Sequence, residues 1–388
     1  MSVIDLTDEV RVKMPLVGMV TRFPPSESAS AQPAMELTRH LHEEHGFPVD
    51  VIRLVTSGER APGGDPVVMD LDADWHLSAG LAARRVNRCD AVIVQVDRHI
   101  PLALIEDLLA RVEVPAIVSL DEVGPPGNDE SRRLAGLAAD ADVTVVPSET
   151  ARRRLESEIS GRARIEVIPH GSAWSPLAGR KRSRRNILSW GFITPGMGAE
   201  RVLRSMALLG DLRPSPRYRL VGVGDPGWSR GDVADYRLFL TNEAERLGLG
   251  DSFEMIPILH RREGLRREIE WSDLIAVVYD SRDRACSRVL CEAVSTARPV
   301  VATEFPGAVE MFSTGEGLGA GATVPHDDDQ ALAEALRSYL TDDEAYLRAS
   351  AAGSRAGAAL SWSSIARQYA TLVSQEVGRQ GLLAGTRP

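Results

Sequence analysis

Short apolar runs alternate with amphipathic segments along the first half of the chain. After an apolar start at 15–20, runs rich in Val and Ile predict strands at 49–55, 91–95, 115–120, 143–147 and 165–169. The segments between them have helical periodicity, most clearly at 35–41, 101–111 and 149–158. Apolar strands that alternate with helices indicate a parallel sheet buried on both faces.

The same alternation starts again after residue 185. It predicts strands at 186–190, 218–222, 253–256, 274–278 and 299–303. It predicts helices at 199–209, 232–247, 289–296, 329–339 and 363–377. The acidic run Asp327–Asp329 precedes one of these helices, and we interpret it as helix-start residues, since carboxylates stabilise a helix N-terminus.

The two halves are separated by the polar, basic stretch 179–185, which has no periodicity and is typical of an interdomain linker. The fold class that we predict is α/β, with two Rossmann-like, doubly wound parallel-sheet domains. Their bounds are 1–178 and 179–360, and a C-terminal segment, 361–388, carries the last helix. Two such domains facing each other hold a ligand in the cleft between the carboxyl ends of their strands.

The composition excludes some classes of protein. Of 388 residues, 43% are hydrophobic, and the net charge is −10. These values exclude global disorder and argue against a general nucleic-acid binder, which carries a basic face. Residues 1–178 contain 18 Lys and Arg against 28 Asp and Glu, whereas residues 179–388 contain 27 of each. The negative excess therefore lies entirely in the first half.

The three cysteines have no metal-ligand spacing, and we interpret Cys89, Cys286 and Cys291 as buried small hydrophobic residues of a protein from a reducing compartment. The acidic N-terminus lacks a signal-peptide pattern, and no apolar run approaches the ~18 residues that span a bilayer. We therefore expect a cytoplasmic protein without a transmembrane segment, with peripheral attachment to the inner membrane face as an alternative.

Two glycine-containing segments follow predicted strands of the second half. Gly191, Gly196 and Gly198 connect a strand to a helix, where backbone N–H groups and the helix dipole favour an anion. A plain tight turn explains these glycines equally well. Gly222 and Asp225 belong to a GxGxxG match, but the residues that follow do not suit a dinucleotide site. We interpret that segment as a strand-end turn facing the cleft.

Three arginines, Arg282, Arg284 and Arg288, lie within seven residues at the start of the helix predicted at 289–296. Cations are unfavourable at a helix N-terminus without an anion or acidic partners. Asp280 and Asp283 are the local candidates for such partners. A bound phosphate resolves the conflict as well, and we favour it slightly.

Two further features suggest sites. His170 and Gly171 follow the last strand of the first half, and we interpret them as a hinge in which Gly171 permits a positive φ and His170 is a candidate ligand contact. The DxD spacing of Asp70 and Asp72 could hold a divalent metal against a diphosphate, but a solvated loop is the favoured interpretation.

The order of several segments resembles that of GT-B glycosyltransferases. These segments are 141–149, 167–171, 189–200, 292–294, 298–303 and 305–306. The similarity is to glycosyltransferase family 4 (glycosyl transferases group 1), and it extends from Thr21 to the helix after Trp362. It implies transfer from a nucleotide-diphosphate sugar with retention of anomeric configuration and with no separate cofactor. It also implies a donor nucleotide on the second domain and a last helix that packs back on the first.

The resemblance assigns roles to residues of the second domain, but this sequence differs from the family pattern at several positions. Glu292 matches the second Glu of the E-x7-E signature, which hydrogen-bonds the donor ribose, whereas the first Glu is replaced by Arg284. The basic pair that binds phosphate is replaced by Phe192 and Met197, and the small Ser-Gly turn by Ser287-Arg288.

Departures also occur in the first domain. The family's His after the third buried strand corresponds to the region 95–99, the His of a following strand end to the region of Asp121, and the Gly-rich first loop to 26–30. Stabilisation of the leaving diphosphate needs preorganised cations and N–H donors, and the loss of one costs about a hundredfold in rate or more. Either the three arginines replace the lost groups, or the chain has kept the fold and lost catalysis.

The leading prediction is therefore a divergent glycosyltransferase of the hexosyltransferase type that uses a UDP- or GDP-linked sugar and an unidentified glycan, lipid or small-molecule acceptor. The predicted donor-binding residues are Gly191, Gly196, Gly198, Gly222, Asp225, Arg282, Arg284, Ser287, Arg288 and Glu292. A catalytically degenerate GT-B protein that serves as partner or scaffold of an active glycosyltransferase is the alternative. A metal-dependent enzyme using Asp70 and Asp72 is a weaker third hypothesis, and we expect no metal.

Overall fold

The computed structural model describes residues 14–26, 28, 30–55, 64–72, 78–174, 176, 185–225, 227–257 and 262–385. All of the predicted linker except Arg185 lies outside the described residues, as do Asp74 and the extreme N-terminus. The chain divides into two compact units. One unit comprises Met1–Ser119, Leu137–Thr144 and Ala366–Pro388, and the other comprises Leu120–Gly136 and Val145–Ile365. The predicted domain bounds stay a prediction.

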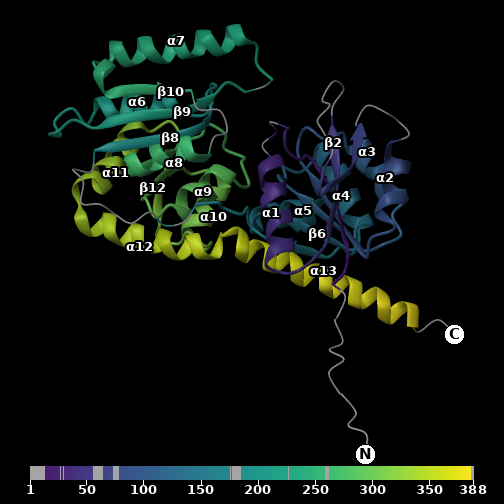
Figure 1. Ribbon diagram of the computed structural model, residues 1–388. Helices are drawn as coiled ribbons and strands as arrows, with labels where there is room; N and C mark the ends of the chain where they lie inside the picture. The colour runs from purple at the N-terminus through teal and green to yellow at the C-terminus, as the bar shows by residue number, and fades with distance from the viewer. Residues whose placement is uncertain are drawn as a thin grey trace, which may run out of the picture. The chain divides into compact units, whose positions relative to one another are not determined.

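A seven-stranded sheet forms from the apolar runs of the first half (Figure 1). Its strands are β1 (Val17–Thr21), β2 (Val49–Val55), β3 (Val67–Asp72), β4 (Ala91–Val96), β5 (Ala116–Leu120), β6 (Val143–Val146) and β7 (Ile165–Val167). Their order in the sheet is β3-β2-β1-β4-β5-β6-β7. The helices between them are α1 (Ala31–Glu43), α2 (Ser78–Val86), α3 (Leu102–Leu109), α4 (Asp129–Asp140) and α5 (Glu149–Glu158).

A six-stranded sheet forms from the second half, with the order β10-β9-β8-β11-β12-β13. Its strands are β8 (Asn186–Phe192), β9 (Arg217–Val223), β10 (Phe253–Ile256), β11 (Leu274–Val277), β12 (Val300–Thr303) and β13 (Gly321–Val324). Its helices are α6 (Ala199–Ala207), α7 (Arg230–Arg246), α8 (Arg262–Trp271), α9 (Arg288–Ser295), α10 (Pro306–Ser313), α11 (Asp329–Thr341) and α12 (Asp343–Ala359). A short 3-10 turn, η1 (Gly250–Ser252), precedes β10.

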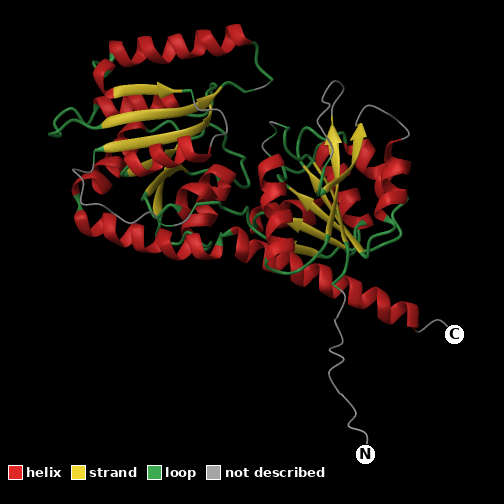
Figure 2. Cartoon of the chain, in the orientation of Figure 1, coloured by secondary structure: helices red, strands yellow, loops and turns green. Residues whose placement is uncertain are grey.

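Both faces of the six-stranded sheet are covered by helices (Figure 2). Neighbouring residues of one strand enter different cores: Ile187 packs with residues of α6 and α11, and Leu188 packs with residues of α9, α10 and α12. Each of the two is 0% exposed. This explains the unbroken apolar runs, because successive side chains of a strand point to opposite faces.

The last helix, α13 (Trp362–Gly385), extends beyond the predicted 363–377. The Tyr369 hydroxyl lies 2.8 Å from the Ser119 hydroxyl at the end of β5, and the Gln380 side-chain amide donates to the Glu113 carbonyl oxygen at 3.1 Å. The predicted helix-start role of the acidic run is confirmed, because the Asp328 carboxylate accepts the Ala331 N–H as the cap of α11. No helix of the described residues is long and apolar enough to cross a membrane.

Each sheet has one pair of neighbouring strands at which the strand order reverses, so that the later strands are added on opposite sides of the pair. In the seven-stranded sheet this pair is β1 and β4, and in the six-stranded sheet it is β8 and β11. Ligands of open α/β sheets bind outside the carboxyl ends of such strands, at the topological switch point. The two switch points are therefore where a site is expected.

Candidate functional site

Two strand–helix turns meet at the carboxyl ends of β8 and β11. Gly191 lies at the end of β8, and the turn after this strand contains Gly196 and Gly198. The turn after β11 contains Arg282 and Arg284, and Arg288 is the first residue of α9. The Asp280 N–H donates to the Gly196 carbonyl oxygen at 2.9 Å, which joins the two turns. Sequence positions about 80 residues apart are thus brought together at the switch point of this sheet.

Two glycines at this edge are required by backbone geometry. Gly198, at the N-cap of α6, has a φ of 78°, and a Cβ there would lie 1.5 Å from the Val278 carbonyl oxygen. Gly222 has a φ of 153°, and a Cβ there would lie 1.8 Å from the carbonyl oxygen of Gly191, its partner in β8. Backbone geometry alone therefore accounts for both glycines. The tight-turn interpretation is sufficient for Gly198, whereas Gly222 lies within β9 and not in the strand-end turn that we predicted.

The N-terminus of α6 already has a negative charge in its first turn. Glu200 lies there, and its carboxylate accepts the Tyr236 hydroxyl at 2.8 Å. Further along the same edge, the Asp225 carboxylate accepts the Gly227 N–H at 2.8 Å within its own turn. α7 begins only at Arg230, after a Ser229 cap. Asp225 therefore has a local turn role in this structure.

The acidic partners of the arginines differ from the local candidates, Asp280 and Asp283. Asp280 pairs with Arg201 of α6 at 2.5 Å, because the turn after β11 lies against the start of α6. Arg282 pairs with Asp327 at 2.6 Å, and Arg201 contacts the same aspartate. Two arginines and two aspartates thus form one cluster of balanced charge.

Arg288 pairs with Asp121, which follows β5, at 2.7 Å. Burial works against the charge of Arg288, but the carboxylates of Asp121 and Glu292 outweigh it and raise the pKa of the arginine. Arg288 stands where the resemblance has a Gly, and Asp121 lies in the region where it has a His, so two departures from that pattern contact each other. Sequence reasoning placed both positions but gave no signal that they form a pair.

Arg284 has a different environment. Its guanidinium carbon lies 4.6 Å from the centroid of the Tyr279 ring, a cation–π contact. Its Nε is buried and has no hydrogen-bond partner among the described residues. No carboxylate in the described part of the chain forms an ion pair with it. Of the three arginines, it is the one whose charge is not balanced by an aspartate.

The backbone around Arg284 is anchored by three successive carbonyl groups. The Asp283 carbonyl accepts from Arg154 of α5 at 2.7 Å, and the Ala285 carbonyl accepts from the Ser148 hydroxyl at 3.0 Å. The Arg284 carbonyl accepts the Gly307 N–H of α10 at 3.0 Å.

The anchoring helices α5 and α10 are themselves connected. Glu310 of α10 accepts the N–H groups of Glu149 and Thr150 at the start of α5, both at 2.8 Å. The loop thus rests on a bonded pair of helices.

Ser287 and Glu292 belong to the start and body of α9. The Ser287 hydroxyl accepts the Leu290 N–H at 3.1 Å as the cap of the helix and lies 3.1 Å from the Tyr279 hydroxyl. Glu292 accepts the indole N–H of Trp190 from β8 at 3.3 Å. Glu292 therefore lies on the side of α9 that faces the switch point.

His170 contacts the same loop. Its Nε2 lies 3.6 Å from the Cys286 thiol, which also donates to the Asp121 carbonyl at 3.4 Å. Burial and then the charge of Arg288 hold the pKa of His170 well below its usual value, and burial raises the pKa of Cys286 well above its own. This is a neutral pair of thiol and imidazole. All three cysteines are buried, as predicted.

The expectation of a positive φ at Gly171 is wrong, because its φ lies outside the left-handed region. The glycine is required for another reason: a Cβ there would lie 2.5 Å from the Trp362 ring. The neighbouring Ser172 N–H donates to the Leu360 carbonyl at 2.7 Å. Close approach of the C-terminal segment therefore explains the small residue, and the hinge role stays a prediction.

A second polar cluster lies at the switch point of the seven-stranded sheet, at the ends of β1 and β4. The Thr21 hydroxyl bonds to the Gln95 side-chain oxygen at 2.7 Å, and the Ser30 hydroxyl bonds to Asp97 at 2.5 Å. Arg22 is 6% exposed and donates to the His99 carbonyl at 3.3 Å. Sequence reasoning named the regions 95–99 and 26–30 but missed that Thr21 and Arg22 complete the cluster. Polar residues directly after two buried strands were the available signal.

The prediction that the DxD segment is a solvated loop is wrong for Asp70 and Asp72, because both residues lie in β3. Both carboxylate oxygens of Asp70 accept from Arg53, at 2.7 and 2.9 Å. Asp74 lies outside the described residues. In the described part of the chain, no group of three His, Cys, Asp or Glu could hold a metal ion.

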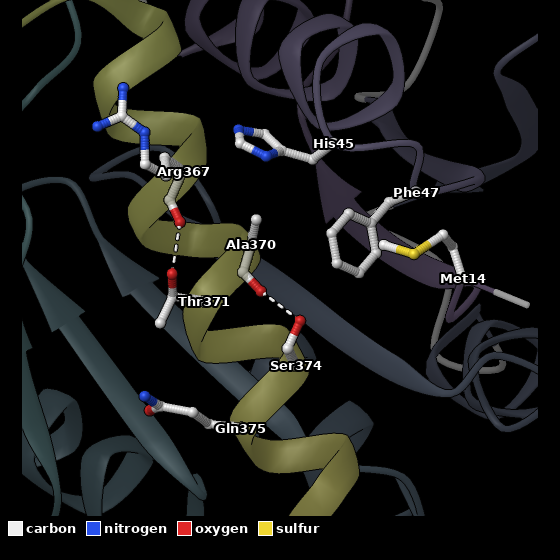
Figure 3. Close-up of a pocket in the computed structure, with 8 residues that line it drawn as sticks. All are labelled: Met14, His45, Phe47, Arg367, Ala370, Thr371, Ser374 and Gln375. Carbon is white, nitrogen blue, oxygen red and sulfur yellow. Dashed lines mark hydrogen bonds between the residues drawn. The ribbon is translucent and has the colours of Figure 1, made fainter. Parts of the chain in front are cut away.

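A pocket of about 460 Å³ lies elsewhere, between α13 and the loop from α1 to β2 (Figure 3). His45, Phe47 and Arg367 line it, and the Thr371 and Ser374 hydroxyls beside it bond back to carbonyls of their own helix at 2.9 Å. The loop before β2 is at the amino end of that strand, opposite to the switch point. We therefore do not identify this pocket with the functional site.

The family comparison matches the part of the chain that contains the six-stranded sheet. Residues 177–356 match the family model described as glycosyl transferases group 1. Over 280 residues the chain is 30% identical to a D-inositol 3-phosphate glycosyltransferase of Kineococcus radiotolerans, covering 66% of this chain. The chain spans about three fifths of that relative, 61% of its length.

Solved structures match the whole fold. Sucrose-phosphate synthase from Thermosynechococcus elongatus superposes with a TM-score of 0.68 at 18% identity, covering 96% of this chain and all of that one. HepE of Anabaena, solved in complex with UDP, gives a TM-score of 0.67 at 15% identity over 93% of this chain and all of that one. The chain has the GT-B fold, with two parallel-sheet α/β domains, as predicted.

Proposed function

We propose that the protein transfers a sugar from a nucleotide-diphosphate sugar to an acceptor with retention of anomeric configuration, as a divergent member of the family 4 type. The observation that carries the proposal is the direct contact of the turns after β8 and β11 at a switch point, through Asp280 and Gly196. The match of residues 177–356 to glycosyl transferases group 1 and the UDP complex of a protein with the same fold support it.

In this proposal the donor lies at the carboxyl edge of the six-stranded sheet. Glu292 accepts hydrogen bonds from the ribose hydroxyls, the role that the resemblance gives it. Gly196 leaves space for the diphosphate, because a Cβ at this position would have no atom within 4 Å. Negative charge that develops on the leaving diphosphate then needs a cation held in place by the protein.

The acceptor, in turn, is proposed at the polar cluster of Thr21, Arg22, Ser30, Gln95 and Asp97. Hydroxyl, amide and carboxylate groups are what a polyhydroxylated molecule needs for orientation. A glycan, a small polyol and the head of a lipid share this chemistry. A lipid acceptor would bring the protein to the inner membrane face, and the other two suit a cytoplasmic enzyme.

The first test is titration calorimetry with UDP and GDP, followed by NMR of the product anomer with a panel of polyol acceptors. Binding of one nucleotide with a Kd below about 1 mM, and a product with the anomeric configuration of the donor, are expected. No heat with either nucleotide at several hundred micromolar protein would overturn the proposal.

A catalytically degenerate partner protein remains the second candidate. It is favoured by Phe192 and Met197 in place of the basic pair and by the Arg288–Asp121 pair. Donor binding without any hydrolysis or transfer, over hours at high enzyme concentration, would support this candidate. Turnover that disappears in the Glu292→Gln variant would exclude it.

A further inference from the structure

We propose that Arg284 is the anion-binding side chain of this site: it binds an anionic oxygen group of the nucleotide-diphosphate sugar, while Arg282 and Arg288 remain in ion pairs within the protein. The inference rests on the proposed function and deepens it. It assigns the positive role to a position where the family pattern has an acidic residue.

The two other arginines are already neutralised. Arg288 pairs with Asp121 at 2.7 Å, and the two side chains are only 20% and 22% exposed. Arg282 pairs with Asp327 at 2.6 Å, and both side chains are more than half exposed. An anion that approached Arg282 would meet the carboxylate of Asp327 as well, which reduces the net attraction.

Arg284 combines a fixed position with an unused donor. Its Nε has no hydrogen-bond partner among the described residues, and in the described part of the chain no carboxylate forms an ion pair with its guanidinium. The Tyr279 ring beneath the guanidinium is 4% exposed and orients the plane without supplying a hydrogen-bond acceptor at its face. A planar guanidinium held in this way presents paired N–H donors to phosphate or carboxylate oxygens.

Backbone anchoring makes the position independent of the ligand. The carbonyls of Asp283, Arg284 and Ala285 are held by α5, α10 and the residue before α5. A cation that is preorganised in this way loses little conformational entropy on binding, so more of its attraction appears as affinity.

The anionic group has two sources in such a donor: the diphosphate, or a carboxylate on an acidic sugar. The experiment titrates UDP, UDP-glucose, UDP-glucuronate and inorganic pyrophosphate into the full chain and into Arg284→Gln. Arg246→Gln, an exposed arginine of α7 paired with Glu243, is the matched control. Arg284→Lys keeps the charge without the planar donor set, and circular dichroism with thermal melting verifies that each variant is folded.

If Arg284 binds the diphosphate, Arg284→Gln weakens every ligand about tenfold or more, and Arg284→Lys recovers part of the loss. If it binds a sugar carboxylate, only UDP-glucuronate weakens by that factor. Both results support the proposal, and we expect Arg282→Gln to change affinity by less than about threefold.

The proposal is overturned if folded Arg284→Gln binds all four ligands like the control, or if Arg282→Gln has the larger effect. These outcomes leave the proposed function intact. If the unmodified protein binds neither these four ligands nor GDP, the proposed function and this inference both fail.

Discussion

The two sheets place different side chains around the same arrangement of strands. At the β1–β4 switch point, Thr21 bonds to Gln95 and Ser30 bonds to Asp97, so hydroxyl, amide and carboxylate groups are bonded to one another. At the β8–β11 switch point, glycine turns and arginines occupy the equivalent place. A shared topology therefore fixes where a ligand is expected, and the residues at the strand ends differ between the two places.

The largest effect is expected from a substitution in the glycine turn at the β8–β11 switch point. Gly198→Ala should lower the free energy of unfolding by about 3–5 kcal/mol, because it combines a strained φ with a clash against the Val278 carbonyl. Urea denaturation measures it. Gly136→Ala in α4, where a Cβ meets nothing within 4 Å, is the control and should stabilise by up to about 1 kcal/mol. A loss below about 1 kcal/mol in Gly198→Ala would contradict the geometry.

A smaller effect is expected from the pair of Asp121 and Arg288. Asp121→Asn should destabilise by about 2 kcal/mol, less than for a fully enclosed pair because a fifth of each side chain is exposed. The double variant with Arg288→Met should recover more than half of this loss, since no uncompensated charge remains. Additive effects in that double-mutant cycle would show that the two residues are not coupled.

The burial of His170 predicts a pH dependence of the free energy of unfolding. Its pKa is depressed in the folded state, so below the unfolded value of about 6.5 the unfolded chain binds a proton that the folded chain does not. Stability is therefore full above pH 6.5 and falls as the pH is lowered, by up to about 1.4 kcal/mol per pH unit from this group. His170→Gln should show a shallower slope between pH 6.5 and 5 in denaturation experiments. Equal slopes would place the imidazole in solvent.

The smallest expected effect comes from metal removal. Dialysis against EDTA should change nucleotide binding by less than about twofold, because Arg53 occupies both oxygens of Asp70 and leaves the DxD segment without a free carboxylate at that position. Calorimetry before and after readdition of Mg²⁺ and Mn²⁺ measures this. A loss of binding that either ion restores would support the metal-dependent hypothesis.

Much of the fold was predictable because buried strands have an unmistakable pattern. The strands at 49–55 and 253–256 and the helix at 149–158 have the predicted bounds. β3 was missed because Leu71 is its only buried residue and two of its six residues are aspartates. α12 was missed because its Ala, Gly and Ser residues give little contrast between faces.

The site was less predictable than the fold. The turns were placed correctly at strand ends, but Arg282 and Arg288 pair with aspartates 45 and 167 positions away. Local sequence gives no information about such partners, because they depend on which strand ends the topology brings together. The isolation of Arg284 became visible only when the partners of its two neighbours were known.

The contacts of Glu310 have a consequence for the exchange of backbone amide protons. It covers the N–H groups of Glu149 and Thr150, while Gly307 of the same helix donates its N–H to the Arg284 carbonyl. The amide protons of Glu149, Thr150 and Gly307 are therefore exposed by one event, the separation of α10 from its neighbours. In hydrogen-exchange experiments, these three amides are expected to exchange at rates set by the junction of α5 and α10.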